Sequence, residues 1–209
     1  MTREQMRLRK EYETLINKQL FKPTAKNFGF KIISGSAYRK EGDWLYIAHM
    51  ITRYDSLLIR VGVKPLLLDE LFWETFEMKS EVSKKPLSFH VNAAFVPYSL
   101  TFREWVIPFT GIEHTAEVLE QAFTECQYVI TQGLECIQNI PDYRDLLMQC
   151  EHINMLNVIL CDIAEGQYAQ ALAEAEQEIA AGHSGGFATM EKGDIYKYIV
   201  RYCRERLTN

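Results

Sequence analysis

The stretch of this chain that most constrains its fold runs over residues 22–31, where a helical pattern gives way to a strand pattern. Pro23 stands near its start, and proline disfavours helical geometry at the residue before it. Gly29 accepts the positive φ that the ends of helices often need, and it lies between Phe28 and Phe30, which are suited to seal a helix end against a sheet. We therefore expect the first helix to break near Pro23 and a sheet to begin after Gly29.

The residues on either side of this stretch follow two different periods. Over 2–20 the apolar side chains recur mostly every three or four residues, which predicts one amphipathic helix. The next part of the chain contains three apolar runs, separated by short polar connections of the kind that close antiparallel hairpins. These runs are 30–39, 44–53 and 56–63. They predict an antiparallel meander.

Two further segments extend the predicted sheet to four or five strands. Residues 87–95 alternate cleanly between apolar and polar side chains, which is typical of a strand. Residues 105–109 fit an edge strand, because an edge tolerates Pro108. Before these segments, residues 66–78 fit a short helix or a compact loop.

The second half of the chain keeps a helical period almost throughout. Pro141 suits the first turn of one of its helices. The segments with the clearest helical pattern are 113–137, 146–163, 165–181 and 191–207. We therefore expect an α+β fold, with an N-terminal helix and an antiparallel meander sheet followed by an all-helical carboxyl-terminal half. The expected domains are 1–110 and 111–209, with one continuous domain as the alternative.

Hydropathy bears on the compartment. No apolar run approaches the roughly 20 residues that a membrane-spanning helix needs. The amino end also lacks the apolar core of a signal peptide. We therefore expect a cytoplasmic protein that does not bind membranes.

Charge divides the chain more sharply than hydropathy does. Residues 1–110 contain 17 Lys and Arg against 12 Asp and Glu, whereas residues 111–209 contain 6 against 16. A negative field repels nucleic acid and attracts a basic protein partner. We expect Glu174, Glu176 and Glu178 to contact such a partner, and their reversal to lysine to weaken its capture while the fold stays intact. The alternative is a solvated helix surface with no partner.

The sequence contains no recognised catalytic signature. It has no Gly-x-Ser-x-Gly, no phosphate-binding Gly-rich loop ending in Lys-Ser or Lys-Thr, and no Gly-x-Gly-x-x-Gly. Its five cysteines lack the close spacing of a disulfide framework or a zinc site, and buried free thiols explain them better. Its five histidines never pair at metal-ligand spacing on one helix face. We expect no catalytic residue, no metal and no cofactor, and we favour a non-enzymatic protein over an enzyme.

One polar group is a candidate ligand site. His49 and His90 would meet across the sheet if their strands were neighbours. The other members of this group would be Asn92, Arg60 and Tyr38. Such a group on a sheet face would accept an anion or act as a base. The alternative is that both histidines are simply hydrogen-bonded within the sheet.

The run Leu20-Phe-Lys-Pro-Thr-Ala-Lys-Asn-Phe-Gly-Phe-Lys31, with Ala37-Tyr-Arg39 and the later Val91-Asn92, resembles a bacterial family of domains of unknown function, number four-three-zero-four. The likeness covers residues 5–147. This chain departs from the family pattern at Ala37, where the family has an aromatic residue, and at 48–50, which lack the family's glutamine. Because members are often found near polymorphic toxin genes, the resemblance implies an immunity-type role that neutralises a protein partner.

A second resemblance is confined to residues 153–182, which look like one tetratricopeptide-type pair of helices through Gly166-Gln-Tyr168, Ala171-Leu172 and Ala175. Only one unit of this kind is visible, whereas such repeats bury their faces against neighbouring copies. The pair therefore does not predict a repeat protein.

Three functional hypotheses follow, in this order. The first is a non-enzymatic protein-binding module, whose acidic helices bind a basic partner such as a toxin. The second is a small-ligand-binding or hydrolytic domain that uses the histidine group and the Tyr38-Arg39 strand end. The third is a structural subunit of a homo-oligomer, in which the surplus apolar face of the meander is buried against a copy of itself.

Overall fold

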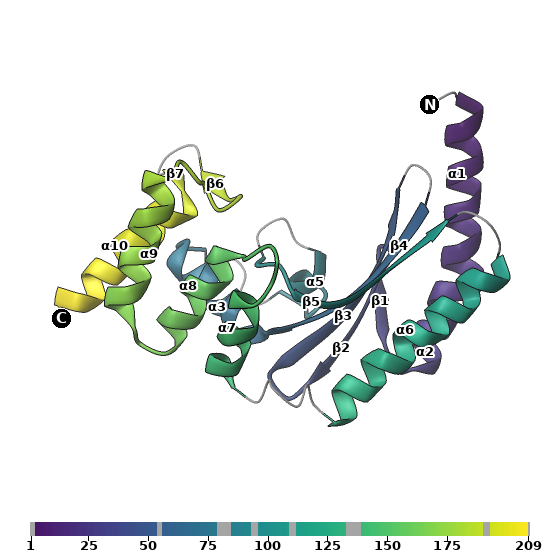
Figure 1. Cartoon of the computed structure of the whole chain (residues 1–209), viewed down its shortest axis with the longest axis horizontal. Coiled ribbons are helices and arrows are strands. Elements are labelled where there is room, and N and C mark those ends of the chain that lie inside the picture. The colour runs from purple at the N-terminus through teal and green to yellow at the C-terminus, as the bar shows by residue number, and fades with distance from the viewer. Residues whose placement is uncertain are drawn as a thin grey trace. The chain divides into compact units, whose positions relative to one another are not determined.

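The structure is a computed structural model that describes residues 3–53, 56–78, 85–92, 96–108, 112–132, 139–189 and 193–208. The chain forms two compact units (Figure 1). Unit 1 comprises Met1–Lys64 with Ser99–Leu134, and unit 2 comprises Pro65–Tyr98 with Glu135–Asn209. The sequence predicts one boundary near residue 110. In the structure each unit instead combines two separate segments of the chain.

The N-terminal helix of unit 1 does not break at Pro23. It continues from α1 (Arg3–Ile16) through a π-helical turn (Asn17–Phe21) into α2 (Lys22–Asn27). The predicted break is therefore wrong. A proline ring clashes with the carbonyl group one turn earlier, and the wider π-helical turn lies where that clash would fall.

The predicted helix exit at Gly29 is confirmed. Gly29 has a φ of 77°, and its N–H donates to the Lys26 carbonyl at 2.9 Å. The N–H of Phe30 donates to the Ala25 carbonyl, also at 2.9 Å. These two bonds satisfy carbonyl groups that the helix end would otherwise leave without partners.

A five-stranded antiparallel meander follows, which confirms the predicted α+β class. Its strands, in spatial order, are β1 (Lys31–Ile33), β2 (Ser36–Glu41), β3 (Trp44–Thr52), β4 (Ser56–Pro65) and β5 (Leu100–Pro108). The single strand expected over 30–39 is two strands, because Ser34 and Gly35 both adopt positive φ and turn the chain. β5 is an edge strand, as predicted, but it begins at Leu100 rather than at residue 105.

Helix α6 (Ile112–Gln132) covers one face of this sheet, and Figure 1 shows α2 on the same side. The ring of Phe123 on α6 packs against Phe21, Phe28 and Phe30, with centroid distances of 5.2–5.9 Å. Arg39 on β2 donates to Gln127 of α6 at 2.6 Å. Acidic α6, assigned by its sequence to the helical half, therefore belongs to the core of unit 1.

The predicted strand at 87–95 is wrong. Within unit 2 the structure places helix α5 (Phe89–Asn92) there, and residues 93–95 lie outside the described residues. Three successive N–H groups, those of Phe89, His90 and Val91, donate to carbonyl groups three residues earlier, beginning at Pro86. Contacts within unit 2 therefore override the alternating pattern, as context often does for β propensity.

The other helices of unit 2 largely follow the prediction. They are α3 (Leu66–Thr75), α7 (Ile140–Met148), α8 (Met155–Ala164), α9 (Tyr168–Ala180) and α10 (Ile195–Thr208). A small hairpin of β6 (Ala188–Thr189) and β7 (Gly193–Asp194) precedes α10. The helix expected over 146–163 is interrupted, because the Asn154 side chain accepts from the Asn157 N–H at 3.3 Å and caps a new helix.

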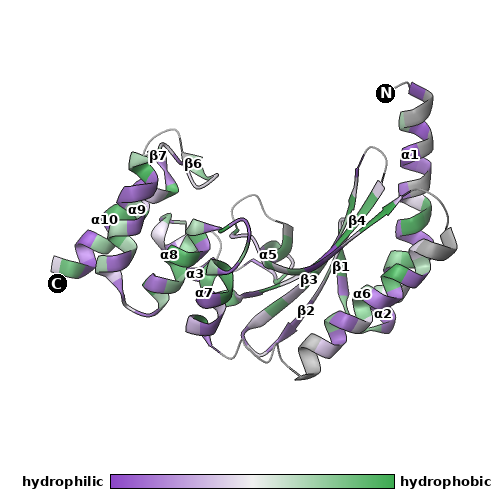
Figure 2. Ribbon diagram, in the orientation of Figure 1, coloured by the Kyte–Doolittle hydropathy of each residue, from purple (hydrophilic) through white to green (hydrophobic). Residues whose placement is uncertain are grey.

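Figure 2 shows hydrophobic residues along β3 and β4 of unit 1 and along α8 of unit 2. Many side chains of these three elements are buried. None of the described helices combines the length and hydrophobicity needed to cross a lipid bilayer. In the described part of the chain, Cys126, Cys161 and Cys203 are buried and Cys150 is half-buried, all as free thiols. Burial raises the pKa of Cys126 and of Cys161 to about 12, which keeps both thiols protonated and unreactive.

Candidate functional site

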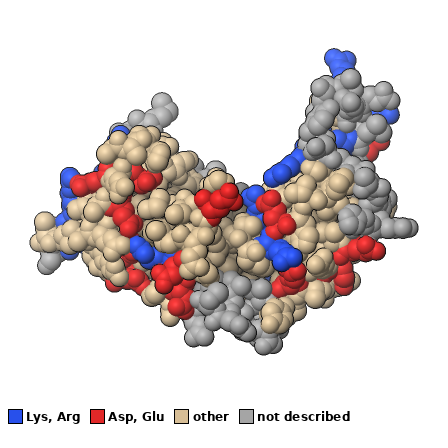
Figure 3. All heavy atoms as spheres, in the orientation of Figure 1, with Lys and Arg blue, Asp and Glu red and all other residues tan. Residues whose placement is uncertain are grey.

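The three glutamates predicted to contact a partner lie on α9, and each has an ionic partner inside unit 2. Glu174 pairs with Arg144 at 3.3 Å, Glu176 with Arg204 at 2.6 Å and Glu178 with His183 at 2.9 Å. Figure 3 shows Lys and Arg atoms next to Asp and Glu atoms over this unit. A lysine at position 174 or 176 would therefore face an arginine of the same unit. Each of these glutamates therefore has a side-chain partner within unit 2.

Glu174 belongs to a partly buried cluster. The Arg144 guanidinium donates to the fully buried Asp162 carboxylate at 2.5 Å and also reaches Glu174. Burial, with the nearby Asp162, raises the pKa of Glu174, and the hydrogen bond to Asp162 raises the pKa of Arg144. Two carboxyl groups thus share one cation, which ties α7, α8 and α9 together.

The predicted pairing of His49 with His90 on one sheet is wrong. His90 lies on α5 in unit 2, where its Nδ1 is 2.7 Å from the buried Asp69 carboxylate and its ring packs on Trp73 at 4.7 Å. Asn92 is the last residue of the same short helix. The group therefore loses both of these members, because α5 is helical and contributes no strand.

The other predicted site residues lie in unit 1, where Tyr38, His49 and Arg60 share one face of the sheet and Arg39 lies on the opposite face. Arg39 is on the face covered by α6, where it donates to Gln127, to Glu41 at 2.6 Å and to the Phe28 carbonyl at 3.3 Å. These bonds fasten α6 and the helix exit to β2. Tyr38 is on the other face and is buried.

A row of polar side chains crosses that second face. Ser36 on β2 is directly opposite His49 on β3, and Ser36 Oγ is hydrogen-bonded to His49 Nδ1 at 2.8 Å. Arg60 on β4 is directly opposite Glu104 on β5, with Arg60 Nε donating to Glu104 Oε2 at 2.9 Å.

The two pairs lie side by side. The Arg53 N–H donates to the Ser56 carbonyl at 2.8 Å, and counting back from this hairpin bond places His49 beside Arg60. The effect of Arg60 on the pKa of His49 agrees with that register. We call these four side chains, Ser36, His49, Arg60 and Glu104, the polar row.

The imidazole in the polar row is a poor base. Burial lowers the pKa of His49 to about 4, and the cations Arg60 and Lys64 act in the same direction. At neutral pH the ring is uncharged. A general base works best when its pKa is near the operating pH, so the Ser36–His49 pair is suited to hydrogen bonding rather than to proton abstraction.

An apolar row runs beside the polar row, one step toward the β3–β4 hairpin. Leu58 is directly opposite Val106, and both lie two residues along their strands from Arg60 and Glu104, hence on the same face. Ile51 stands in the same relation to His49. Val106 is 55% exposed and Ile51 is 39% exposed, whereas Leu58 is buried.

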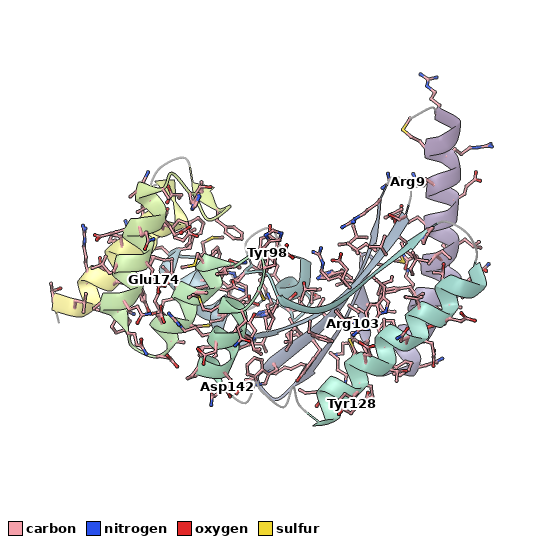
Figure 4. All side chains as sticks on the ribbon, viewed as in Figure 1. Arg9, Tyr98, Arg103, Tyr128, Asp142 and Glu174 are labelled. Carbon is pink, nitrogen blue, oxygen red and sulfur yellow. The ribbon has the colours of Figure 1, made fainter. Side chains whose placement is uncertain are left out.

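These observations define one surface of unit 1, formed by Ile51, Arg60, Glu104 and Val106, which we call the hairpin-end surface. Its two charged side chains are 38% and 35% exposed. Arg103, the neighbour of Glu104, points the other way and pairs with Glu125 of α6 (Figure 4). The surface therefore offers two large apolar side chains next to one ion pair.

Sequence reasoning identified Arg60 here but missed the other three residues of the surface. The predicted edge strand, 105–109, includes Val106 but not Glu104, and only the register of β5 with β4 brings both next to Arg60. Ile51 lies within the predicted strand 44–53, but the exposure of its side chain follows from packing. The sequence signal for this surface is the alternation of side chains between the two faces in β3 and β4, the strands on either side of the β3–β4 turn.

Other parts of the described structure offer less. A hollow of about 480 Å³ along α1 is lined by Arg7, Lys10 and Lys18 among others, and none of its lining residues belongs to the polar row. No group of three or more His, Cys, Asp or Glu side chains within the described ranges is arranged to hold a metal ion. No protein-family model, curated protein or solved structure matches this chain.

Proposed function

We propose that this protein is a protein-binding module that docks its partner on the hairpin-end surface of unit 1. The observation that carries the proposal is the exposure of Val106 and Ile51 on either side of β4, next to the Arg60–Glu104 pair. Exposed apolar side chains beside charged ones are characteristic of protein interfaces, in which an apolar centre supplies affinity and a polar rim supplies orientation.

The surface needs no reactive group to act. Docking requires only that the bound chain complement the apolar and charged side chains of the surface. The proposal also places the protein in the cytoplasm, since the free thiols of the described cysteines suit a reducing compartment. The acidic side chains of α9 have no direct part in it, because each pairs within its own unit.

Two features of the polar row favour docking over the binding or hydrolysis of a small ligand. The Glu104 carboxylate already occupies a position at which Arg60 would receive an anion. The low pKa of His49 makes its imidazole a weak proton acceptor at neutral pH.

Site-specific cross-linking in the source cells tests the proposal. A photo-activated aromatic amino acid is placed at Val106, and the matched control carries it at Gln177, which is exposed on α9. We expect a discrete protein adduct from position 106, which is lost when Ile51 is also changed to Asp, and none of that mass from position 177. Illumination that yields no adduct at 106, or the same adducts at both positions, overturns the proposal.

A further inference from the structure

We infer that the partner on the hairpin-end surface is a second copy of this chain, docked face to face about a two-fold axis. This inference rests on the proposed function and names its partner. It follows from the register of β4 with β5, which places side chains of opposite charge next to each other.

The charged side chains provide the first step. Arg60 and Glu104 are direct cross-strand partners, so a cation and an anion stand side by side at the same level of two neighbouring strands. A partner complements them only if it offers an anion over Arg60 and a cation over Glu104. A second copy of the surface offers this arrangement if its β4 lies over β5 of the first copy and its β5 lies over β4.

A two-fold axis that runs parallel to these strands, between them and in front of the sheet, generates that arrangement. It sets β4 of one copy over β5 of the other and keeps every residue at its own level along the strand. Arg60 of each copy then faces Glu104 of the other. Two intermolecular ion pairs form, and no like charges meet.

The apolar side chains of the surface are matched by the same two-fold rotation. Leu58 and Val106 are also direct cross-strand partners, so the axis brings the apolar level of one copy over the apolar level of the other. Val106, the more exposed of the two exposed apolar residues, then loses its contact with water. Sheets that pack face to face keep their strands nearly aligned, which is the arrangement that this axis generates.

The one two-fold rotation therefore matches the charged side chains and the apolar side chains of the two copies at the same time. An unrelated partner would need an anion over Arg60, a cation over Glu104 and apolar side chains over Val106, all at the matching positions. The two copies need nothing beyond the register that β4 and β5 already have.

Charge reversal tests this inference with the full-length protein. In Arg60→Glu each copy presents two anions, and in Glu104→Arg each copy presents two cations. We expect the wild-type protein to dimerise in sedimentation-velocity experiments and each single variant to dimerise about a hundredfold more weakly, since like charges across an interface cost several kcal/mol.

Mixing the two single variants is the decisive measurement. An Arg60→Glu chain meets a Glu104→Arg chain with opposite charges at both contacts, so we expect the mixture to dimerise with near wild-type affinity. Each chain in the mixture still carries its own like-charged pair. Recovery therefore comes from contact between chains and not from repair within one chain. Circular dichroism of each variant confirms that the fold is kept.

The outcomes separate this inference from the proposal beneath it. A wild-type protein that stays monomeric at every concentration, or a mixture that stays monomeric when the wild type dimerises, overturns the second copy as partner. If a cross-link from position 106 then joins a different protein, docking on this surface still stands. If position 106 gives no adduct at all, the docking function fails as well.

Discussion

The side chain that best shows how environment sets chemistry in this protein is His49. An imidazole whose Nδ1 is hydrogen-bonded to a serine resembles part of a catalytic pair in its geometry alone. Its burial and the neighbouring cations Arg60 and Lys64 remove the basicity that catalysis would need. The residue therefore serves the sheet, where it holds β2 to β3 through Ser36.

His49 should make stability depend on pH. Its pKa is about 4 in the folded protein against an ordinary value of 6.5, so between these values the unfolded chain binds a proton that the folded chain does not. Stability should be complete above pH 6.5 and should fall as the pH drops toward 4, by about 3 kcal/mol. Urea unfolding of wild type and of His49→Gln at a series of pH values checks this.

The variant should lose this part of the pH dependence, because glutamine does not titrate. His152→Gln is the matched control, since it changes an exposed imidazole outside the sheet. Equal pH profiles for wild type and His49→Gln would contradict the assignment.

The ion pairs of unit 2 should differ widely in their contribution to the free energy of unfolding. Changing Arg144 to Ala leaves the fully buried Asp162 carboxylate without its guanidinium, which should cost about 3–5 kcal/mol of unfolding free energy. Arg204→Ala breaks a pair whose side chains are 63% and 49% exposed, and it should cost no more than about 1 kcal/mol. Chemical denaturation of the two variants compares them directly, and similar losses would show that the Asp162 cluster is not what holds these helices together.

Among the elements, α6 departs most from what its sequence alone indicates. Its glutamates group it with the acidic helices of the second half, yet its apolar face closes the core of unit 1. The reason is geometric, because β5 ends beside β4 and α6 follows directly, over the face that also carries Arg39. Charge therefore describes the outer surface of a helix and says little about the unit that its inner face joins.

A pair of aromatic substitutions on α6 tests this packing. Phe123 is fully buried among three other phenylalanines, so Phe123→Ala should destabilise the protein by about 3–5 kcal/mol. Tyr128, one turn further along and 60% exposed, should change stability by no more than about 0.5 kcal/mol when it is replaced by Ala. Thermal unfolding measures both, and a mild effect at Phe123 would mean that α6 is only loosely attached.

Sequence reasoning predicted the meander, the helix exit at Gly29 and most of the helices, because each depends on local periodicity or on one special residue. It failed at a proline that a widened helical turn accommodates, and at a segment whose structure depends on contacts within unit 2. The helix passes Pro23 through a π-helical turn, and α5 forms where alternation predicts a strand. The hairpin-end surface also escaped detection, because Val106 and Arg60 are 46 positions apart and only strand register unites them.

At the scale of the whole molecule, the division into units changes the meaning of the charge asymmetry. Moving α6 into unit 1 leaves that unit with 14 Lys and Arg against 11 Asp and Glu, and unit 2 with 9 against 17. Unit 1 is therefore close to neutral, which suits a surface that is to meet its own copy. The excess of negative charge belongs to unit 2, where arginines of α7 and α10 offset part of it.

The same division predicts which pieces of the chain fold alone. A fragment of residues 1–110 contains every strand of the meander but lacks α6, so Phe21, Phe28 and Phe30 lose the Phe123 ring that joins them. Exposing that much aromatic surface should prevent stable folding. Circular dichroism melting of this fragment should show no cooperative transition.

A chain that joins residues 1–64 to 99–134 through a short Gly-Ser linker should behave in the opposite way. Val63 and Leu100 are already cross-strand partners, so a tight turn can connect β4 to β5 without moving either strand, and α6 is retained. We expect a cooperative melt and well-dispersed amide resonances from this chain. If 1–110 folds and the joined chain does not, then the core of the sheet unit depends on residues 65–98 rather than on α6.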